Sequence, residues 1–379
     1  MDQLTDDLLV EILARVPYKS LRRFTCVSKR WRDLIAHPDH RRKLPQTLAG
    51  FFYHEAQLSA SPTLGFVNAS GTGPPLVDTS FAFLPDRERE SRLTLLDGCN
   101  GLLLFRCYRL ADPMEFDYLV INPATEEWVA VPVTRRWSVK VETVRLGFDP
   151  AVSSHFHVFE FQIDDDGDGE SEDSDDGDGH VLGVKIYSSE SGLWSYKQSG
   201  WEVEPKLNTD FRSAFVDGKL YVVALQCVIG RVDVEGRMWS EIEFPRSEES
   251  PFLDRDVGFI DLSQGHLHFA TSDDIDGDKL AIWVLEDWDN EQWSLKHTVR
   301  FNYLVGRPNV GFGFHQFIIV AIHPQRNMVF FVFGHDRTLM SYDMDSREVC
   351  IICDLGYNCM EHFIPYVPLF SASLANGQL

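Results

Sequence analysis

A sequence pattern that occurs five times between residues 119 and 354 most constrains the fold of this chain. It consists of an apolar run, a turn rich in Asp, Asn, Ser, Thr or Gly, and a large apolar residue that opens an alternating stretch. The anchoring residues are Trp128, Trp194, Trp239, Trp293 and Val349. Their loose period is close to the roughly 40–50 residues of a four-stranded propeller blade. The pattern therefore predicts a repeat of small antiparallel sheets.

A tight turn before an apolar strand forms the other half of the pattern. Such turns begin at Asn100, Asp217, Gln264 and Arg326. Gly and Asn suit the two-residue loops of β-hairpins. With residues near 51–84 as one more blade and a strand at 363–370 helping to close the ring, we predict a six-bladed β-propeller over residues 51–370. A β-sandwich of unrelated hairpins is the alternative.

The first 35 residues differ from the rest because they are dense in helix signals. Apolar residues recur at spacings of three and four: Leu8, Leu9, Ile12, Leu13 and Val16. Thr5 can cap this helix and Pro17 ends it. Ser20 can cap a second, shorter helix, and Ser28 a third that Pro38 closes. The expected fold class is mainly β with a small all-α N-terminal module of three helices.

This small module carries more apolar surface than it can bury within itself. Three short helices without a disulfide or a metal need another surface to be stable. One flank of the first helix holds Leu8 and Ile12, and the other holds Leu9, Leu13 and Val16. We expect one flank to face the other two helices and the second to dock on another protein. Packing against the rest of this chain is the alternative.

Residues 4–31 resemble the F-box of plant F-box proteins in residue order and spacing. One departure is Thr5, where the family usually has proline. The resemblance implies docking on a Skp-type adaptor and, through it, on a cullin-based ubiquitin ligase. The residues expected to bind the adaptor are Leu4, Leu8, Leu9, Ile12, Pro17, Leu21, Val27 and Trp31, with Val27, Trp31 and Ile35 shared between interface and module core.

Most of residues 47–370 also resemble the kelch-like associated domain that follows many plant F-boxes. The resemblance rests on Asp97 to Gly101, on Asn122 to Thr125, and on residues 146–150. The expected domains are an F-box module at residues 1–43, a linker at 44–50, the propeller at 51–370 and a flexible tail at 371–379.

Charge is unevenly distributed along the chain. Residues 1–43 hold ten Lys and Arg against six Asp and Glu, a balance of +4, so the rest of the chain carries −27 of the net charge of −23. So acidic a body excludes general binding to nucleic acid or to anionic membranes. No apolar run is long enough to span a bilayer, no signal peptide is apparent, and the seven scattered cysteines favour a reducing compartment. We expect a cytoplasmic or nuclear protein, or both.

No motif points to a metal, a cofactor or catalysis. The acidic tract at 164–179 places carboxylates at calcium-loop spacing, but its flanks are strand-like, so we expect a disordered loop. Cys350 and Cys353 have zinc spacing without a second pair. No nucleophile, zinc-protease or phosphate-loop motif occurs. We therefore expect no cofactor, no metal and no catalytic residue.

The expected function is a non-catalytic substrate receptor of an SCF-type ubiquitin ligase. The helices would dock on the adaptor, and the propeller would hold an unidentified target protein. Arg135, Arg136, Trp137 and Trp201 are interpreted as exposed candidates for contact with that target. A β-propeller enzyme or a lectin-like scaffold outside any ligase are the rival hypotheses.

Overall fold

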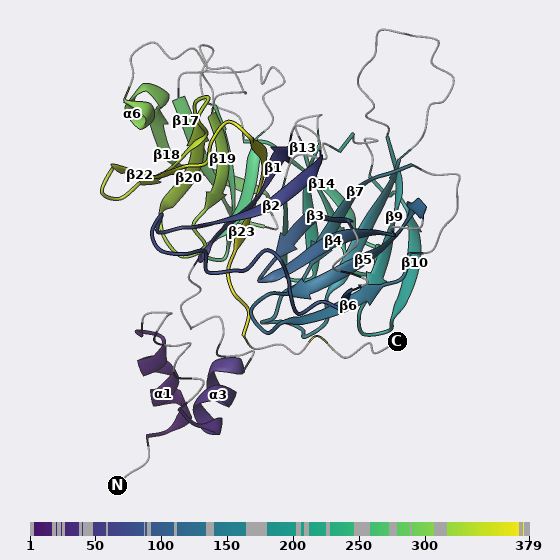
Figure 1. The fold of residues 1–379 in the computed structure, drawn as a ribbon. Coiled ribbons are helices and arrows are strands. Elements are labelled where there is room, and N and C mark those ends of the chain that lie inside the picture. The colour runs from purple at the N-terminus through teal and green to yellow at the C-terminus, as the bar shows by residue number, and fades with distance from the viewer. Residues whose placement is uncertain are drawn as a thin grey trace, which may run out of the picture.

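The structure is a computed structural model. It describes residues 4–16, 20, 24, 27–37, 40, 48–57, 60–86, 88, 92–109, 112–133, 140–163, 180–201, 206–207, 212–224, 228–245, 258–272, 279–288, 290–306, 317–370 and 374. Figure 1 shows two helices, α1 and α3, below a large body of strands. In the described part of the chain, no helix is long and apolar enough to cross a membrane.

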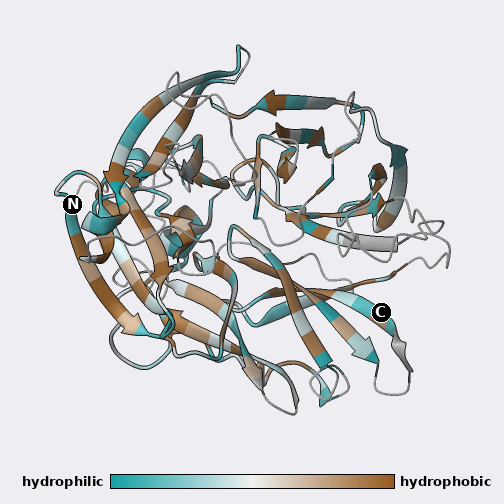
Figure 2. Cartoon of the chain, turned by 90° about the horizontal axis from the view of Figure 1, so that it is seen from above, coloured by the Kyte–Doolittle hydropathy of each residue, from teal (hydrophilic) through white to brown (hydrophobic). Residues whose placement is uncertain are grey.

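The body consists of six antiparallel sheets arranged in a ring, which Figure 2 shows from above. The first blade contains β23 (Cys359–Tyr366), β1 (Gly50–Gln57) and β2 (Ala60–Asn68). The second blade contains β3 (Arg92–Cys99), β4 (Leu102–Arg109), β5 (Asp112–Asn122) and β6 (Glu127–Val131). The third blade contains β7 (Lys140–Gly147), β8 (His157–Ile163), β9 (Val181–Ser188) and β10 (Leu193–Gln198).

The remaining three blades repeat this up-and-down order. The fourth contains β11 (Ser213–Val216), β12 (Lys219–Ala224), β13 (Val228–Asp233) and β14 (Trp239–Glu243). The fifth contains β15 (Phe259–Ser263), β16 (His266–Ser272), β17 (Lys279–Asp287) and β18 (Gln292–Arg300). The short helix α6 (Phe301–Val305) precedes the sixth, which contains β19 (Phe317–Ile322), β20 (Met328–Phe333), β21 (Thr338–Asp343) and β22 (Glu348–Asp354). The predicted fold class, mainly β with a six-bladed propeller, is confirmed.

The two ends of the propeller sequence share one blade and close the ring. β1 pairs with β23 in antiparallel register, with Phe52 opposite Ile364 and Gly50 opposite Tyr366. The innermost strands β3, β7, β11, β15, β19 and β23 contact one another in that order, and β23 contacts β3. The predicted closing strand at 363–370 corresponds to β23, which is the innermost strand of the first blade.

The repeated pattern maps directly onto the blades. All five anchoring residues lie in the fourth, outermost strands of the second to sixth blades. The turns at Asn100, Asp217 and Gln264 join first to second strands, and each of these residues has a positive φ followed by a positive-φ glycine. This backbone matches the right-handed twist of the flanking strands. The sequence pattern therefore indicates the hairpin turns as well as the spacing of apolar residues.

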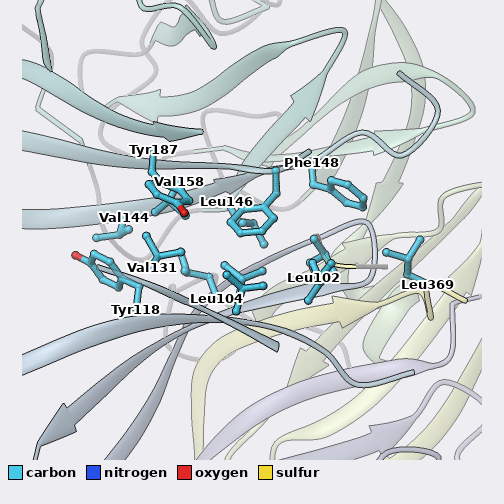
Figure 3. Close-up of a cluster of buried hydrophobic side chains, with 14 residues drawn as sticks. Leu102, Leu104, Tyr118, Val131, Val144, Leu146, Phe148, Val158, Tyr187 and Leu369 are labelled. Atoms are coloured by element: carbon cyan, nitrogen blue, oxygen red, sulfur yellow. The ribbon is translucent and has the colours of Figure 1, made fainter. Parts of the chain in front are cut away.

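The core lies between neighbouring blades. Figure 3 shows one cluster in which Leu104 and Tyr118 of the second blade face Val144 and Leu146 of the third. Leu369, beyond the last strand, joins the same cluster and is fully buried. Alternate residues of each strand point to one of its two faces, so each sheet contributes to two such cores.

Two of the three predicted N-terminal helices are described, α1 (Asp6–Leu13) and α3 (Lys29–Ala36). The predicted middle helix and Pro17 fall largely outside the described residues, of which only Ser20 and Phe24 are helical there. Ser28 caps α3 as expected, since its hydroxyl accepts a hydrogen bond from Trp31 N at 3.2 Å. Thr5 stands at the N-cap of α1 in an extended conformation, but its side chain makes no capping bond. The capping role expected for Thr5 is therefore wrong.

Candidate docking surface on the N-terminal helices

Helix α1 divides into a buried face and an exposed face. Leu9, Val10 and Leu13 are buried, and they pack against Leu34 and Trp31 of α3. Two adjacent helices of eight residues can bury only the sides that face each other. The flank with Leu9 and Leu13 is therefore the internal one.

The opposite flank presents a row of large apolar side chains to solvent. Leu4, Leu8 and Ile12 are 48%, 53% and 46% exposed, although all three are aliphatic. Leu8 and Ile12, four residues apart, lie along one stripe of α1, and Leu4 lies just before the N-cap residue Thr5. Val27, just before α3, is 63% exposed as well. We call Leu4, Leu8, Ile12 and Val27 the exposed row.

An ion pair and an aromatic contact hold the two helices in place. The Arg30 guanidinium lies 2.6 Å from the Asp6 carboxylate and donates a second bond, at 2.8 Å, to the Leu4 carbonyl oxygen. Phe24 meets Trp31 edge-on, with ring centroids 5.0 Å apart. The start of α1, where the exposed row begins, is thus fixed by a residue of α3.

The C-terminal ends of the innermost strands converge on a small mouth beside the point where the chain enters the propeller. A cavity of about 90 Å³ is lined by residues that follow or end β3, β15, β19 and β23, by Arg212 and the first three residues of β11, and by Leu48. Gly98 to Gly101, Asp261, Ile322 and Pro365 are among them. The inner strands therefore run toward the side on which the N-terminal helices lie.

Two buried aspartates connect neighbouring blades around this mouth. Asp97 of β3 accepts a hydrogen bond from Leu146 N of β7 at 2.8 Å. Asp261 of β15 accepts one from Ile322 N of β19 at 3.0 Å and pairs with Arg212 at 2.8 Å. Burial raises the pKa of both carboxyl groups, and the nearby Arg145 and Arg212 oppose that rise. Each carboxylate thus bridges two inner strands.

This pair of carboxylates bears on the rival hypothesis of a propeller enzyme. Raised pKa values at paired acids can signal catalysis. Here both groups accept bonds from backbone amides, and Arg212 ion-pairs with Asp261, so the arrangement is that of a structural clasp. A mouth of about 90 Å³ is also far below the roughly 300–1,000 Å³ of small-molecule sites. Among the described residues no cluster of three His, Cys, Asp or Glu is arranged to hold a metal ion.

Comparison with known families decides the identity of both parts. The model of the F-box domain matches residues 1–43, and the model described as F-box protein At3g26010-like, beta-propeller, matches residues 76–365. The chain belongs to this F-box propeller family. The second match spans well over half of the chain, and it agrees with the six-bladed ring.

Relatives of this F-box protein occur in Arabidopsis thaliana. F-box protein At5g07610 is 25% identical over 305 residues, which cover 78% of this chain and 70% of the relative. Putative F-box protein At3g52320 is 26% identical over 79% of this chain and 73% of its own length. F-box protein At3g26010 is 24% identical over 91% of this chain and 78% of its own length.

The F-box residues expected to bind the adaptor fall into distinct environments. Leu4, Leu8, Ile12 and Val27 are exposed, whereas Trp31 and Ile35 are half-buried. Leu9 is 6% exposed and belongs to the core between the two helices, so its side chain is not part of the exposed row. Pro17 and Leu21 lie outside the described residues.

The four residues interpreted as exposed candidates for target contact are either outside the described residues or buried. Arg135, Arg136 and Trp137 lie outside the described residues. Trp201 is 7% exposed. Its ring stacks on Phe161 and meets the Trp239 ring edge-on, with ring centroids 4.7 Å apart. Its indole N–H donates to backbone oxygens of β13 and β14. The interpretation of Trp201 as an exposed residue is therefore wrong, because the fourth blade uses it as core.

Sequence reasoning missed the inter-blade aspartates. Aspartate is abundant in this F-box protein, so no single carboxylate stands out. The usable signal was positional: Asp97 and Asp261 each lie three residues before a turn, Asn100–Gly101 and Gln264–Gly265. An acid repeated at the same place in two hairpins indicates a shared structural role.

Proposed function

We propose that this F-box propeller protein is the substrate-recognition subunit of an SCF-type cullin ubiquitin ligase. Its helices dock on a Skp-type adaptor, and its propeller holds a target protein for ubiquitination. The protein contributes no catalytic side chain, and it acts by raising the effective concentration of target lysines near the ligase. It works in the cytoplasm, the nucleus or both.

The single observation that carries this proposal is the exposed row on and beside α1. Exposing Leu8 and Ile12 on one short helix, with Leu4 just before it, is costly in water, at roughly 25 cal/mol per Å² of apolar surface. The described part of the propeller leaves Leu4, Leu8 and Ile12 uncovered. An amphipathic helix with such a row fits the groove of a partner protein.

The topology also supports separate docking sites for the adaptor and the target. Chain entry to the propeller lies beside the end of β23, since Ala49 N donates to Tyr366 O at 2.8 Å. On this side the strands are joined by short turns such as Asn100–Gly101. The fourth strand of one blade ends, and the first strand of the next begins, on the opposite side. That opposite side is where loops carrying specificity would meet a target without touching the adaptor.

A matched pair of variants tests adaptor docking. We expect the double variant Leu8→Ala with Ile12→Ala to weaken binding to a purified Skp-type adaptor by at least about tenfold per residue, as for central interface residues. The control is Leu182→Ala with Leu295→Ala, since these propeller residues are 41% and 47% exposed. The measurement is titration calorimetry on the full chain, with near-ultraviolet circular dichroism to verify the fold. Equal affinity of both double variants would rule out docking through α1.

A further inference from the structure

A second candidate site lies at the outer seam between the fourth and fifth blades. It is an open cleft of about 480 Å³. Its lining residues come from the end of β14, from β17, from the following turn and from β18: Glu243, Phe244, Pro245, Trp283, Asn290, Glu291 and Trp293. This volume lies within the roughly 300–1,000 Å³ of ligand-binding pockets. Nothing in the docking of the helices uses this cleft.

Two tryptophans form the aromatic wall of the cleft. Trp283 lies opposite Leu295, and Trp293 lies opposite Leu285, so both indoles project from the same face of the fifth blade. Both rings are half-buried against the core of the fourth and fifth blades. Each indole therefore keeps part of its surface available to a ligand.

The orientation of the Trp293 ring is fixed by its neighbours. Its indole N–H donates to the Glu243 carbonyl oxygen at 3.1 Å, across the seam. The Phe269 ring meets the Trp293 ring edge-on, with ring centroids 6.0 Å apart. Phe244 packs on Phe269, with ring centroids 4.4 Å apart. A wall that is already ordered loses little conformational entropy when a ligand binds.

The charge of the lining is negative. Glu291 contributes its carboxylate and Glu243 its backbone carbonyl oxygen, and the seven lining residues include no Lys, Arg or His. The nearest ion pair is long, with Arg231 Nη2 3.8 Å from Glu291 Oε1. Indole faces and carboxylates both attract cations, and indole is the strongest of the aromatic cation binders.

We propose that this cleft binds a lysine or arginine side chain from a basic segment of the target protein. The inference rests on the proposed function, because it names the chemistry of the target. The charge of −27 outside the N-terminal 43 residues would draw a basic protein toward the propeller. The cleft is open along the seam and larger than a lone ammonium group requires, so the flanking peptide fits as well.

The test uses the full chain and a fluorescein-labelled peptide of sequence GGKRGG, measured by fluorescence anisotropy at low salt. The neutral peptide GGQQGG is the reference. We expect GGKRGG to bind and GGQQGG not to bind, and we expect Trp283→Leu and Glu291→Gln each to weaken binding about five- to tenfold. Trp283 is chosen because Trp293 also holds the seam together.

The matched controls make the same two substitutions, Trp→Leu and Glu→Gln, away from the cleft. Trp194→Leu removes a tryptophan whose indole N–H makes the equivalent bond, to Pro132 O at 2.6 Å, at another seam. Glu348→Gln removes one exposed charge on β22. Both controls should bind GGKRGG as the unchanged protein does. Equal binding of both peptides, or equal losses in the cleft and control variants, would overturn the proposal.

Two further measurements separate the possible outcomes. Tetramethylammonium should displace GGKRGG at concentrations at which sodium does not, because it competes for the same indole faces, and a lack of displacement would overturn the proposal. Adaptor affinity should be the same in the cleft variants and in the unchanged protein. Failure of the unchanged protein to bind adaptor would refute the ligase proposal, whereas the peptide affinities would still decide the chemistry of the cleft.

Discussion

The side chain of Arg30 connects α3 to the start of α1, because its guanidinium lies 2.6 Å from Asp6 and also bonds to the Leu4 carbonyl oxygen. Both side chains of the ion pair are about half exposed. Solvent therefore screens it, and such pairs contribute up to about 1 kcal/mol. The value of the contact lies in positioning the exposed row.

We expect Arg30→Met to weaken adaptor binding by a few fold, about the factor that up to 1 kcal/mol allows. Titration calorimetry with the adaptor would measure it. Arg32→Met is the control, because within the described residues the ion pair of Arg32 is with its sequence neighbour Asp33, at 3.6 Å. If both variants bound equally well, Arg30 would have no role in placing α1.

Removal of the Asp97 carboxylate should destabilise the propeller. Asp97→Ala leaves Leu146 N and the Ser213 hydroxyl without this acceptor, at a cost of about 1–3 kcal/mol for each buried donor left unsatisfied. Asp97→Asn keeps an acceptor oxygen and should cost less. Urea unfolding measures the difference. The control is Asp117→Ala, which breaks an exposed ion pair with Arg109 and should cost no more than about 1 kcal/mol. If Asp97→Ala and Asp117→Ala lowered the free energy of unfolding by similar amounts, Asp97 would not be a structural clasp.

Substitution of Trp201 tests whether this residue belongs to the core of the propeller or to its surface. We expect Trp201→Ala to lower the free energy of unfolding by about 3–5 kcal/mol, as for other buried aromatics. Trp201→Phe should cost less, because it retains the ring that stacks on Phe161 and loses the two hydrogen bonds of the indole N–H. Urea titrations followed by circular dichroism would show this. An unchanged midpoint for Trp201→Ala would restore the residue as a surface candidate.

Acid should destabilise the propeller through buried histidines. Burial lowers the pKa of His323 to about 4, and its Nδ1 accepts a bond from Gln325 N at 3.0 Å. The unfolded chain, with a pKa near 6.5, binds more protons between about pH 6.5 and pH 4, so stability is lost as the pH falls through that window.

His323→Asn removes this titration and keeps an acceptor for Gln325 N. We expect the free energy of unfolding to fall less between pH 7.5 and pH 5 in the variant than in the unchanged protein, by about 1–2 kcal/mol. Asp97 and Asp261 have raised pKa values, so they act in the opposite sense, but they contribute equally to both proteins. Parallel pH profiles would show that His323 is not the group responsible.

Much of the fold could be predicted from local patterns. The apolar spacing in α1 separated the flank of Leu9 and Leu13, which is buried, from the flank of Leu8 and Ile12, which is exposed. The anchors such as Trp128 and Trp194 marked the fourth strands, because an outer strand needs a large residue to cover the seam beside it. These features depend only on neighbours in sequence.

Features that depend on distant residues were not predictable in the same way. Trp201 looked like a loop residue, and only the arrangement of β13 and β14 shows that it is buried. The aromatic cleft brings Trp283 and Trp293 beside the end of β14, about 40 residues earlier in the chain. No spacing rule identifies such a site, since it forms where two blades meet.

The pairing of β1 with β23 has a consequence for how the protein is made. A ribosome completes the docking helices first and β23 after every other strand of the ring. A chain interrupted before Cys359 carries an F-box but lacks the inner strand of the first blade. On the proposed function, such a fragment would compete for adaptor without presenting a finished receptor. Premature stop codons late in the reading frame should therefore act as dominant inhibitors rather than as simple losses of function.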